Sequence, residues 1–121
     1  MTEGDCFVSS AHKAFETEGG VLCHGRPRFL GPPEEAQPDG RFWHAWVEVE
    51  IPGTLVTMVL DHSNGRKIVM PQQTYYQLGE IDPEEVCRYG FHEALEQMIQ
   101  YNHYGPWNQD YPPLPEDSEV E

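Results

Sequence analysis

The sequence predicts an α+β fold, in which a helix is followed by mostly antiparallel strands and then by a second helix. Apolar residues recur at helical spacing near both ends of the chain, over residues 6–18 and 91–101. Between them, residues 41–50 and 54–61 each gather apolar side chains on one face, and a Pro-Gly pair separates the two segments. This pattern is typical of a β-hairpin.

Length and composition indicate how the chain is divided. It has 121 residues, of which 38% are hydrophobic, and this is enough for one small core. Residues 110–121 carry five acidic side chains and three prolines but no Lys or Arg. We therefore expect a single α+β domain over residues 1–109 and an acidic, Pro-rich, disordered tail over residues 110–121.

The charge balance limits the partners. Seven basic residues stand against 21 acidic ones, so the formal net charge is −14, and −9 remains without the tail. A strongly acidic chain is a poor match for nucleic acid or for an anionic membrane surface, and neither is expected as a partner. A cationic protein or peptide suits it better. The charge predicts no particular oligomeric state.

The ends and the cysteines favour a cytoplasmic protein. The first five residues contain neither a basic segment nor an apolar one, and no apolar run is long enough to cross a membrane. The chain has three cysteines, an odd number that does not suit a disulfide framework. We therefore expect free thiols in a reducing compartment.

The first helix, over about residues 6–18, is predicted to end at a Gly-Gly pair. A short strand is expected at residues 21–24. Residues 26–40 contain four prolines, which predicts a long surface loop. A loop of that length within a small domain is often functional.

The hairpin has a register that the side chains themselves suggest. A loop centred on residues 52–53 places Val47 opposite Met58 and His44 opposite Asp61. The apolar pairs then share the core face, while His44 lies on the face away from the core. A Pro-Gly type II turn is not the favoured hairpin turn, so a bulge or a slip of two residues stays open.

Four more elements are expected after the hairpin. Residues 67–70 and 75–81 are strand candidates, and residues 86–89 form a last short strand. Residues 91–101 form the C-terminal helix, with apolar side chains along one face. Trp107 follows this helix and is expected to fold back over the core.

Three side chains fit nucleophilic acyl transfer by a thiol. Cys6 lies at the start of the first helix, where the partial positive charge of the helix end lowers a thiol pKa. Asp61 is the expected cross-strand neighbour of His44 and can orient its imidazole. The roles are nucleophile for Cys6, general base and acid for His44, and orienting carboxylate for Asp61, with Asn64 as a rival. The backbone N–H of Cys6 would contribute to the oxyanion hole.

The order of these residues resembles that of the papain-like and transglutaminase-like cysteine enzymes. The matching strings are Asp5-Cys6-Phe7-Val8, His44-Ala45-Trp46-Val47-Glu48 and Leu60-Asp61-His62-Ser63-Asn64-Gly65, and the string that begins at His44 is most similar to the transglutaminase-like branch. The resemblance implies an N-terminal helix that carries the cysteine and packs on an antiparallel sheet that carries the histidine and the aspartate. It also implies reactions at amide or ester carbonyls, with peptidase, transglutaminase and deamidase activities as open alternatives.

Two residues on the face of His44 are candidates for substrate binding. Trp46 either lines a substrate groove or supports the imidazole. Glu48, with Glu50 on the same face, would favour cationic peptides or amines.

No cofactor or metal is expected, because Cys23 and His24 lack the spacing to other ligands that a zinc site requires. The alternative function is a non-catalytic acidic binding protein that covers a basic surface or mimics nucleic acid.

Overall fold

The computed structural model describes residues 5–28, 38–62, 67–105 and 107. The elements in chain order are α1 (Asp5–Glu16), β1 (Val21–Gly25), β2 (His44–Glu50), β3 (Thr57–Asp61), β4 (Ile68–Pro71), α2 (Gln72–Gly79), a 3-10 helix (Pro83–Glu85), β5 (Cys87–Tyr89) and α3 (Phe91–Tyr101). The predicted tail over residues 110–121 and most of the 26–40 loop lie outside the described residues.

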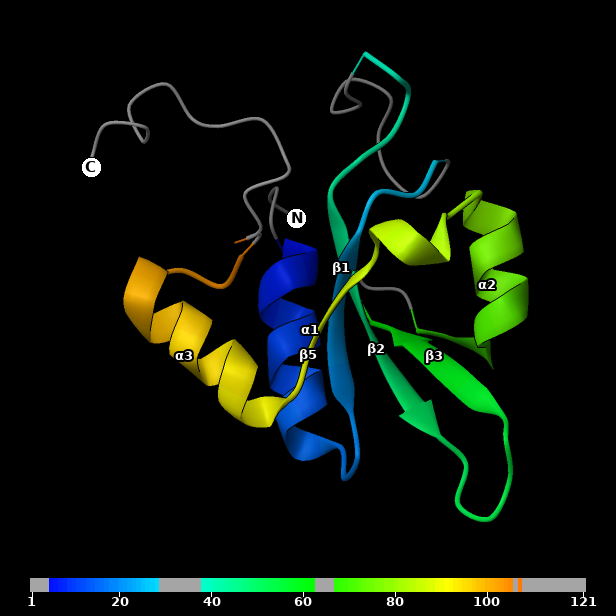
Figure 1. The fold of residues 1–121 in the computed structure, drawn as a ribbon, viewed down its shortest axis with the longest axis horizontal. Helices are drawn as coiled ribbons and strands as arrows, with labels where there is room; N and C mark the ends of the chain where they lie inside the picture. Colours follow the sequence, from blue (N-terminus) through cyan, green and yellow to red (C-terminus); the bar gives the residue numbers. More distant parts are fainter. Residues whose placement is uncertain (1–4, 29–37, 63–66, 106, 108–121) are drawn as a thin grey trace.

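The five strands form one antiparallel sheet in the order β4-β3-β2-β1-β5. Figure 1 shows α1 and α3 on one side of this sheet and α2 on the other. The predicted α+β class is confirmed, with the N-terminal helix packed on the sheet and a helix at the C-terminal end. Because helices cover both sides, the central strands β1 and β2 are buried almost throughout.

β2 and β3 pair in a register that is shifted by two residues from the predicted one, which assumed a loop centred on the Pro-Gly pair. Val47 lies opposite Leu60. The backbone N–H of Thr54 donates to the carbonyl of Ile51 at 3.1 Å, and Gly53 has a φ of 79°, which together make a type II turn. The twist of this turn does not match that of a two-residue hairpin, so extra residues are needed before the strands pair. A shift of two residues leaves every side chain on its predicted face.

The prediction of a strand over residues 75–81 is wrong, because this segment belongs largely to α2. Pro71 precedes the helix in an extended conformation, and Glu80 ends it in the left-handed region with a φ of 51°. Tyr75 and Tyr76 are both buried in the core between α2 and the sheet. Adjacent residues of a strand point to opposite faces, so only a helical backbone turns both rings toward the same surface.

Each side of the sheet has its own hydrophobic core. On the side of α1 and α3 the buried residues are Ala11, Ala14, Leu22, Val47, Ala94 and Trp107. On the side of α2 they are Cys23, Trp46, Val59, Tyr75, Tyr76 and Ile81. The face of His44 was expected to lie away from the core, and this expectation is wrong because α2 covers that face. The expected folding back of Trp107 over the core is confirmed.

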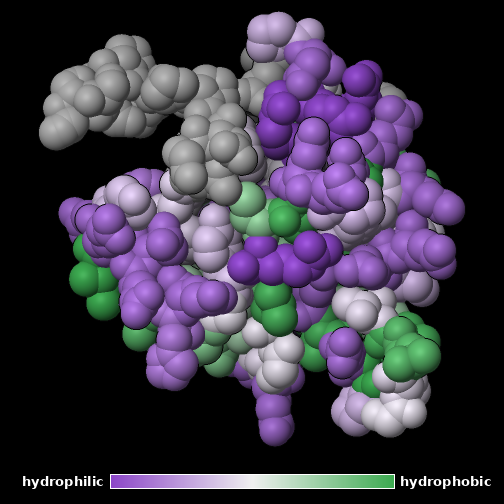
Figure 2. Space-filling model, viewed as in Figure 1, coloured by the Kyte–Doolittle hydropathy of each residue, from purple (hydrophilic) through white to green (hydrophobic). Residues whose placement is uncertain are grey.

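The remaining elements follow the sequence pattern closely. β4 and β5 correspond to the predicted strands within one residue, and α3 has the predicted bounds. Of the apolar face of α3, Ala94 is buried, whereas Phe91 and Ile99 are 50% and 75% exposed. Figure 2 shows hydrophobic surface over α3, at the left of the view. No helix within the described residues has both the length and the apolar character needed to span a membrane.

Candidate functional site

Cys6 lies in the first turn of α1, and its side chain lies outside the described part of the structure. The next residue, Phe7, is buried in a small cluster with Ala45, which follows His44 in β2. The first turn of α1 and the first residues of β2 therefore meet at one end of the sheet, the upper end in Figure 1. Ala45 faces α1, so His44 points to the opposite face at the same end.

His44 and Asp61 form a buried pair. Nε2 of His44 lies 2.9 Å from Oδ2 of Asp61, and the two residues are 4% and 0% exposed. The hydroxyl of Tyr75 in α2 donates to the same carboxyl oxygen at 2.7 Å. The predicted contact between His44 and Asp61 is present, but as a diagonal pair across the shifted register rather than a directly opposed one.

This geometry defines what the histidine can do. A carboxylate that accepts from Nε2–H fixes the tautomer and the orientation of the ring, and it favours the imidazolium form. The second hydrogen bond, from Tyr75, holds the carboxyl group of Asp61 in place. Because the pair is buried, these interactions are stronger than they would be in water. The arrangement suits a base that exchanges a proton through Nδ1.

Trp46 packs directly behind the histidine. Its ring centroid lies 6.1 Å from that of His44, and the residue is fully buried. Of the two roles expected for Trp46, this position suits the support of the imidazole, because a side chain without exposed surface does not line a groove.

Glu48 is the second buried carboxyl group of the α2 side. Its Oε2 accepts from Trp46 Nε1 at 3.0 Å and from the hydroxyl of Tyr76. Its Oε1 accepts from Gln72 Nε2 at 2.9 Å and from Arg88 Nε at 3.3 Å. Four donors fill the usual acceptor positions of a carboxylate. Contact of Glu48 with a substrate stays a prediction.

Sequence reasoning missed Tyr75 as a partner of Asp61. The reason is the interpretation of residues 75–81 as a strand, which gave this ring no defined neighbour. A signal was present in the Pro71-Gln72-Gln73 sequence, since a proline followed by good helix formers is a common helix start.

His24 is a second buried histidine at the same end of the sheet. It lies on β1, faces α1, and its ring centroid is 4.9 Å from that of Phe7 and 4.9 Å from that of Trp107. The residue is 0% exposed, and neither ring nitrogen has a hydrogen-bond partner within the described structure. Burial, with smaller contributions from His103 and His44, lowers the pKa of His24 to about 3. The sequence signalled His24 only as a poor metal ligand.

Other nucleophile and metal candidates are weak in the described residues. Burial, followed by the neighbouring Glu48, raises the pKa of the Cys23 thiol well above its ordinary value. A thiol of that kind is inert at neutral pH. No group of three or more potential ligands gathers in a metal-binding arrangement among residues 5–28, 38–62, 67–105 and 107.

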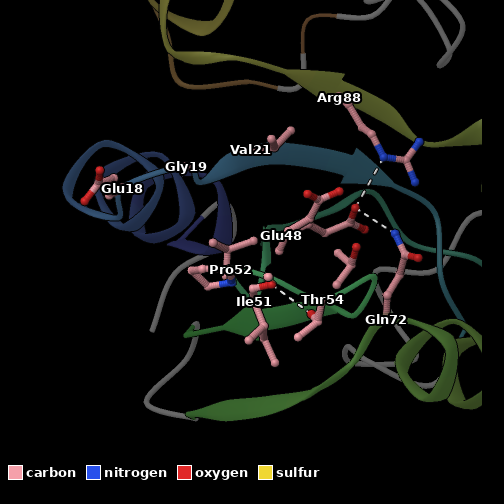
Figure 3. A pocket seen from close by; sticks show the side chains of 13 residues that line it. Glu18, Gly19, Val21, Glu48, Ile51, Pro52, Thr54, Gln72 and Arg88 are labelled. Atoms are coloured by element: carbon pink, nitrogen blue, oxygen red, sulfur yellow. Dashed lines mark hydrogen bonds and ion pairs between the residues drawn. The ribbon is translucent and has the colours of Figure 1, made fainter.

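A cavity of about 880 Å³ opens at the opposite end of β2 from His44. Figure 3 shows Glu48, Arg88 and Gln72 at one end of it, with Glu18 at the other and Pro52 and Ile51 of the hairpin beside it. Its size is in the range of small-ligand sites. The cavity is separate from the His44–Asp61 pair.

We compared the chain with family models, with curated proteins and with solved structures, and none of these comparisons found a match.

Proposed function

We propose that the protein catalyses thiol-dependent acyl transfer at amide carbonyls, as a peptidase, transglutaminase or deamidase does. Cys6 is the nucleophile, His44 the general base and acid, and Asp61 the orienting carboxylate. The observation that carries the proposal is the buried contact of 2.9 Å between His44 Nε2 and Asp61 Oδ2. Its support is the meeting of the first turn of α1, which holds Cys6, with the first residues of β2 at one end of the sheet, where the proposed reaction needs the thiol to reach around that end to the face of His44.

The contact between Asp61 and Nε2 assigns the reacting proton to the other ring nitrogen. In the proposed reaction, Nδ1 of His44 takes the proton of the Cys6 thiol, and the thiolate attacks the carbonyl carbon. The imidazolium then donates that proton to the leaving amine as the tetrahedral intermediate collapses to a thioester. Water or an amine resolves the thioester, which restores the thiol. Asp61 stabilises the imidazolium at both stages.

The start of α1 contributes the electrostatics of this mechanism. Backbone N–H groups in the first turn of a helix have no acceptor within the helix, and they favour a negative charge nearby. They would lower the pKa of Cys6 and, through the Cys6 N–H, stabilise the oxyanion of the intermediate. The chain order of helix, His strand and Asp strand supports the finer proposal of a papain-like or transglutaminase-like core.

The proposed substrate is a protein or peptide, with a preference for cationic segments. The described acidic side chains support this preference, because most of them are exposed and only Glu48 and Asp61 are buried. A positive peptide is attracted to such a surface, and the attraction weakens as salt is added.

Alkylation of Cys6 by iodoacetamide, measured against pH in the intact protein, tests the proposal. A thiol paired with His44 reacts well below the ordinary thiol pKa of about 8.5. Peptide mapping by mass spectrometry reports Cys6 and the half-buried Cys87 in the same sample, so Cys87 serves as an internal control. In His44→Gln we expect the profile of Cys6 to move up toward that of an ordinary thiol, with no change at Cys87.

The decisive result comes from the wild-type protein and does not depend on the stability of a variant. If Cys6 stays unreactive, or if its rate rises only near the pKa of a free thiol, the catalytic proposal is wrong. Binding of a polylysine peptide in low salt would then be the next measurement. Equal binding by the wild-type protein and by Cys6→Ser would favour the alternative, an acidic binding protein.

A further inference from the structure

Arg88 is held in place at the surface by groups that lie in the interior. It lies on β5, its side chain is 40% exposed, and its Nε donates to Glu48 Oε1 at 3.3 Å. Its Nη2 donates to the hydroxyl of Tyr76 at 2.8 Å. These two bonds fix the plane of the guanidinium group. Within the described structure, they use two of its five N–H donors, which leaves three for a ligand.

A second hollow, of about 400 Å³, opens beside this guanidinium group. The three glutamines of α2 line it, and Ile81 and Pro83 supply apolar walls. The residues that line it are Gln72, Gln73, Tyr76, Gln77, Ile81, Pro83 and Arg88, and none of them is acidic.

This composition is unusual in a chain with a net charge of −14. The neighbouring larger cavity, by contrast, includes the carboxyl groups of Glu18 and Glu50 as well as that of Glu48. Arg88 and Gln72 line both, so they form the boundary between an acidic cavity and a hollow without acids. An anion that reaches Arg88 therefore meets less repulsion from the side of α2.

We propose that the hollow between α2 and β5 binds a carboxylate, which pairs with the guanidinium group of Arg88 while the side-chain amides of α2 donate to it. A guanidinium fork matches a planar carboxylate with two parallel N–H···O bonds. Glu48 already pairs with this guanidinium group at 3.3 Å, so a ligand is held by the remaining N–H donors and the amides, and a carboxylate adds one negative charge where a phosphate dianion would add two. The amides and the apolar wall suit a carboxylate that ends a peptide or a small organic acid.

The site is independent of the proposed catalysis. Glu48 follows His44 by four residues along β2, which corresponds to about 13 Å. Carboxylate binding can therefore be measured whether or not Cys6 is a nucleophile.

Chemical-shift mapping by NMR on the whole chain tests the inference. The probes are acetyl-trialanine with a free C-terminal carboxylate, the same peptide with a C-terminal amide, and sodium acetate. We expect the free acid to shift the side-chain signals of Gln72, Gln73, Gln77 and Arg88 Nε–H, and the amide to leave them in place. A comparable response to acetate identifies a site for small acids, and a response to the peptide alone identifies a peptide C-terminus.

Gln77→Glu and Gln100→Glu make a matched pair of variants. Both add one negative charge to a helix, but Gln77 lines the hollow and Gln100 lies exposed on α3. Neither residue contacts the buried Glu48, so both variants should keep the fold. We expect Gln77→Glu to weaken binding of the free acid by roughly tenfold through like-charge repulsion, and Gln100→Glu to leave it unchanged. Equal shifts with acid and amide, no shifts with any probe, or equal binding by both variants would overturn the proposal.

Discussion

Two buried histidines lie on opposite faces of the same sheet, and their surroundings differ. His44 faces α2, where Asp61 lies 2.9 Å from its Nε2. His24 faces α1, among the rings of Phe7, Tyr89 and Trp107, and has no hydrogen-bond partner within the described residues. The two side chains are almost equally buried, at 4% and 0% exposed. The difference between them is polar contact, not depth.

The two faces of the sheet differ in the same way. On the α2 side, buried carboxyl groups of Asp61 and Glu48 gather donors from α2 and from β5. On the α1 side, packing is mainly by aliphatic and aromatic groups, and the imidazole of His24 and the hydroxyl of Ser10 are buried polar exceptions. A buried polar group with partners fixes one arrangement, whereas one without partners lowers stability. This contrast indicates that the α2 side determines the geometry of the candidate site.

Loss of the partner of His44 should have the largest effect. Asp61→Ala removes the acceptor of both His44 and Tyr75, so both lose this buried contact. We expect the free energy of unfolding to fall by about 3–5 kcal/mol. Urea unfolding measures the change. Asp61→Asn, which keeps an amide oxygen at the same place, should lower the free energy of unfolding clearly less. An equal loss in both variants would mean that Asp61 contributes to stability only through packing.

His24, which has no hydrogen-bond partner among the residues that the structure describes, should affect the pH dependence of stability. The pKa of His24 is about 3 in the folded protein and 6.5 as an ordinary value, so between these values only the unfolded chain binds the proton. The stability that the protein has with a neutral His24 is therefore fully present above pH 6.5 and is lost as the pH falls toward 3. Each pH unit below 6.5 should lower the free energy of unfolding by about 1.4 kcal/mol.

Substitution of His24 isolates this effect. His24→Leu should lose that part of the acid dependence, whatever its packing does to the stability at neutral pH. His92→Leu, at an exposed position of α3, is the control and should keep the dependence of the wild type. Parallel pH curves for His24→Leu and the wild type would contradict the assignment of a buried, neutral imidazole.

The smallest effect is expected from the second donor to Asp61. Tyr75→Phe removes only the hydroxyl that donates at 2.7 Å and keeps the ring in the core. We expect a loss of about 1–2 kcal/mol in urea unfolding, since one buried hydrogen bond disappears. The pH profile of Cys6 alkylation should change less in this variant than in His44→Gln. A stability equal to that of the wild type would show that Tyr75 contributes only its ring.

The hairpin shows how far local patterns reach. Alternation of apolar and polar residues assigned His44 and Asp61 to one face, and the structure agrees, because a slip of two residues preserves the face. The register itself was not determined by that pattern. It depends on the type II turn at Gly53 and on the residues that this turn adds to the loop.

α2 shows where local patterns fail. Thr74, Tyr75 and Tyr76 have strand propensity, but tertiary packing overrides propensity when two adjacent rings are buried on one surface. The error had a consequence for the site, because α2 carries Tyr75 and covers the face of His44. Partners such as Tyr75 for Asp61, or Arg88 for Glu48, come from segments 14 and 40 residues away in the chain.

The sequence by itself determined the α+β class, the position of Cys6 at the start of a helix and the shared face of His44 and Asp61. These follow from periodicities of two and 3.6 residues, which are properties of the local backbone. Only the tertiary structure decided that both faces of the sheet are buried, that Tyr75 completes the His44–Asp61 pair and that His24 finds no hydrogen-bond partner among the described residues. These features depend on how distant segments pack together, and burial makes each polar contact, or its absence, energetically important.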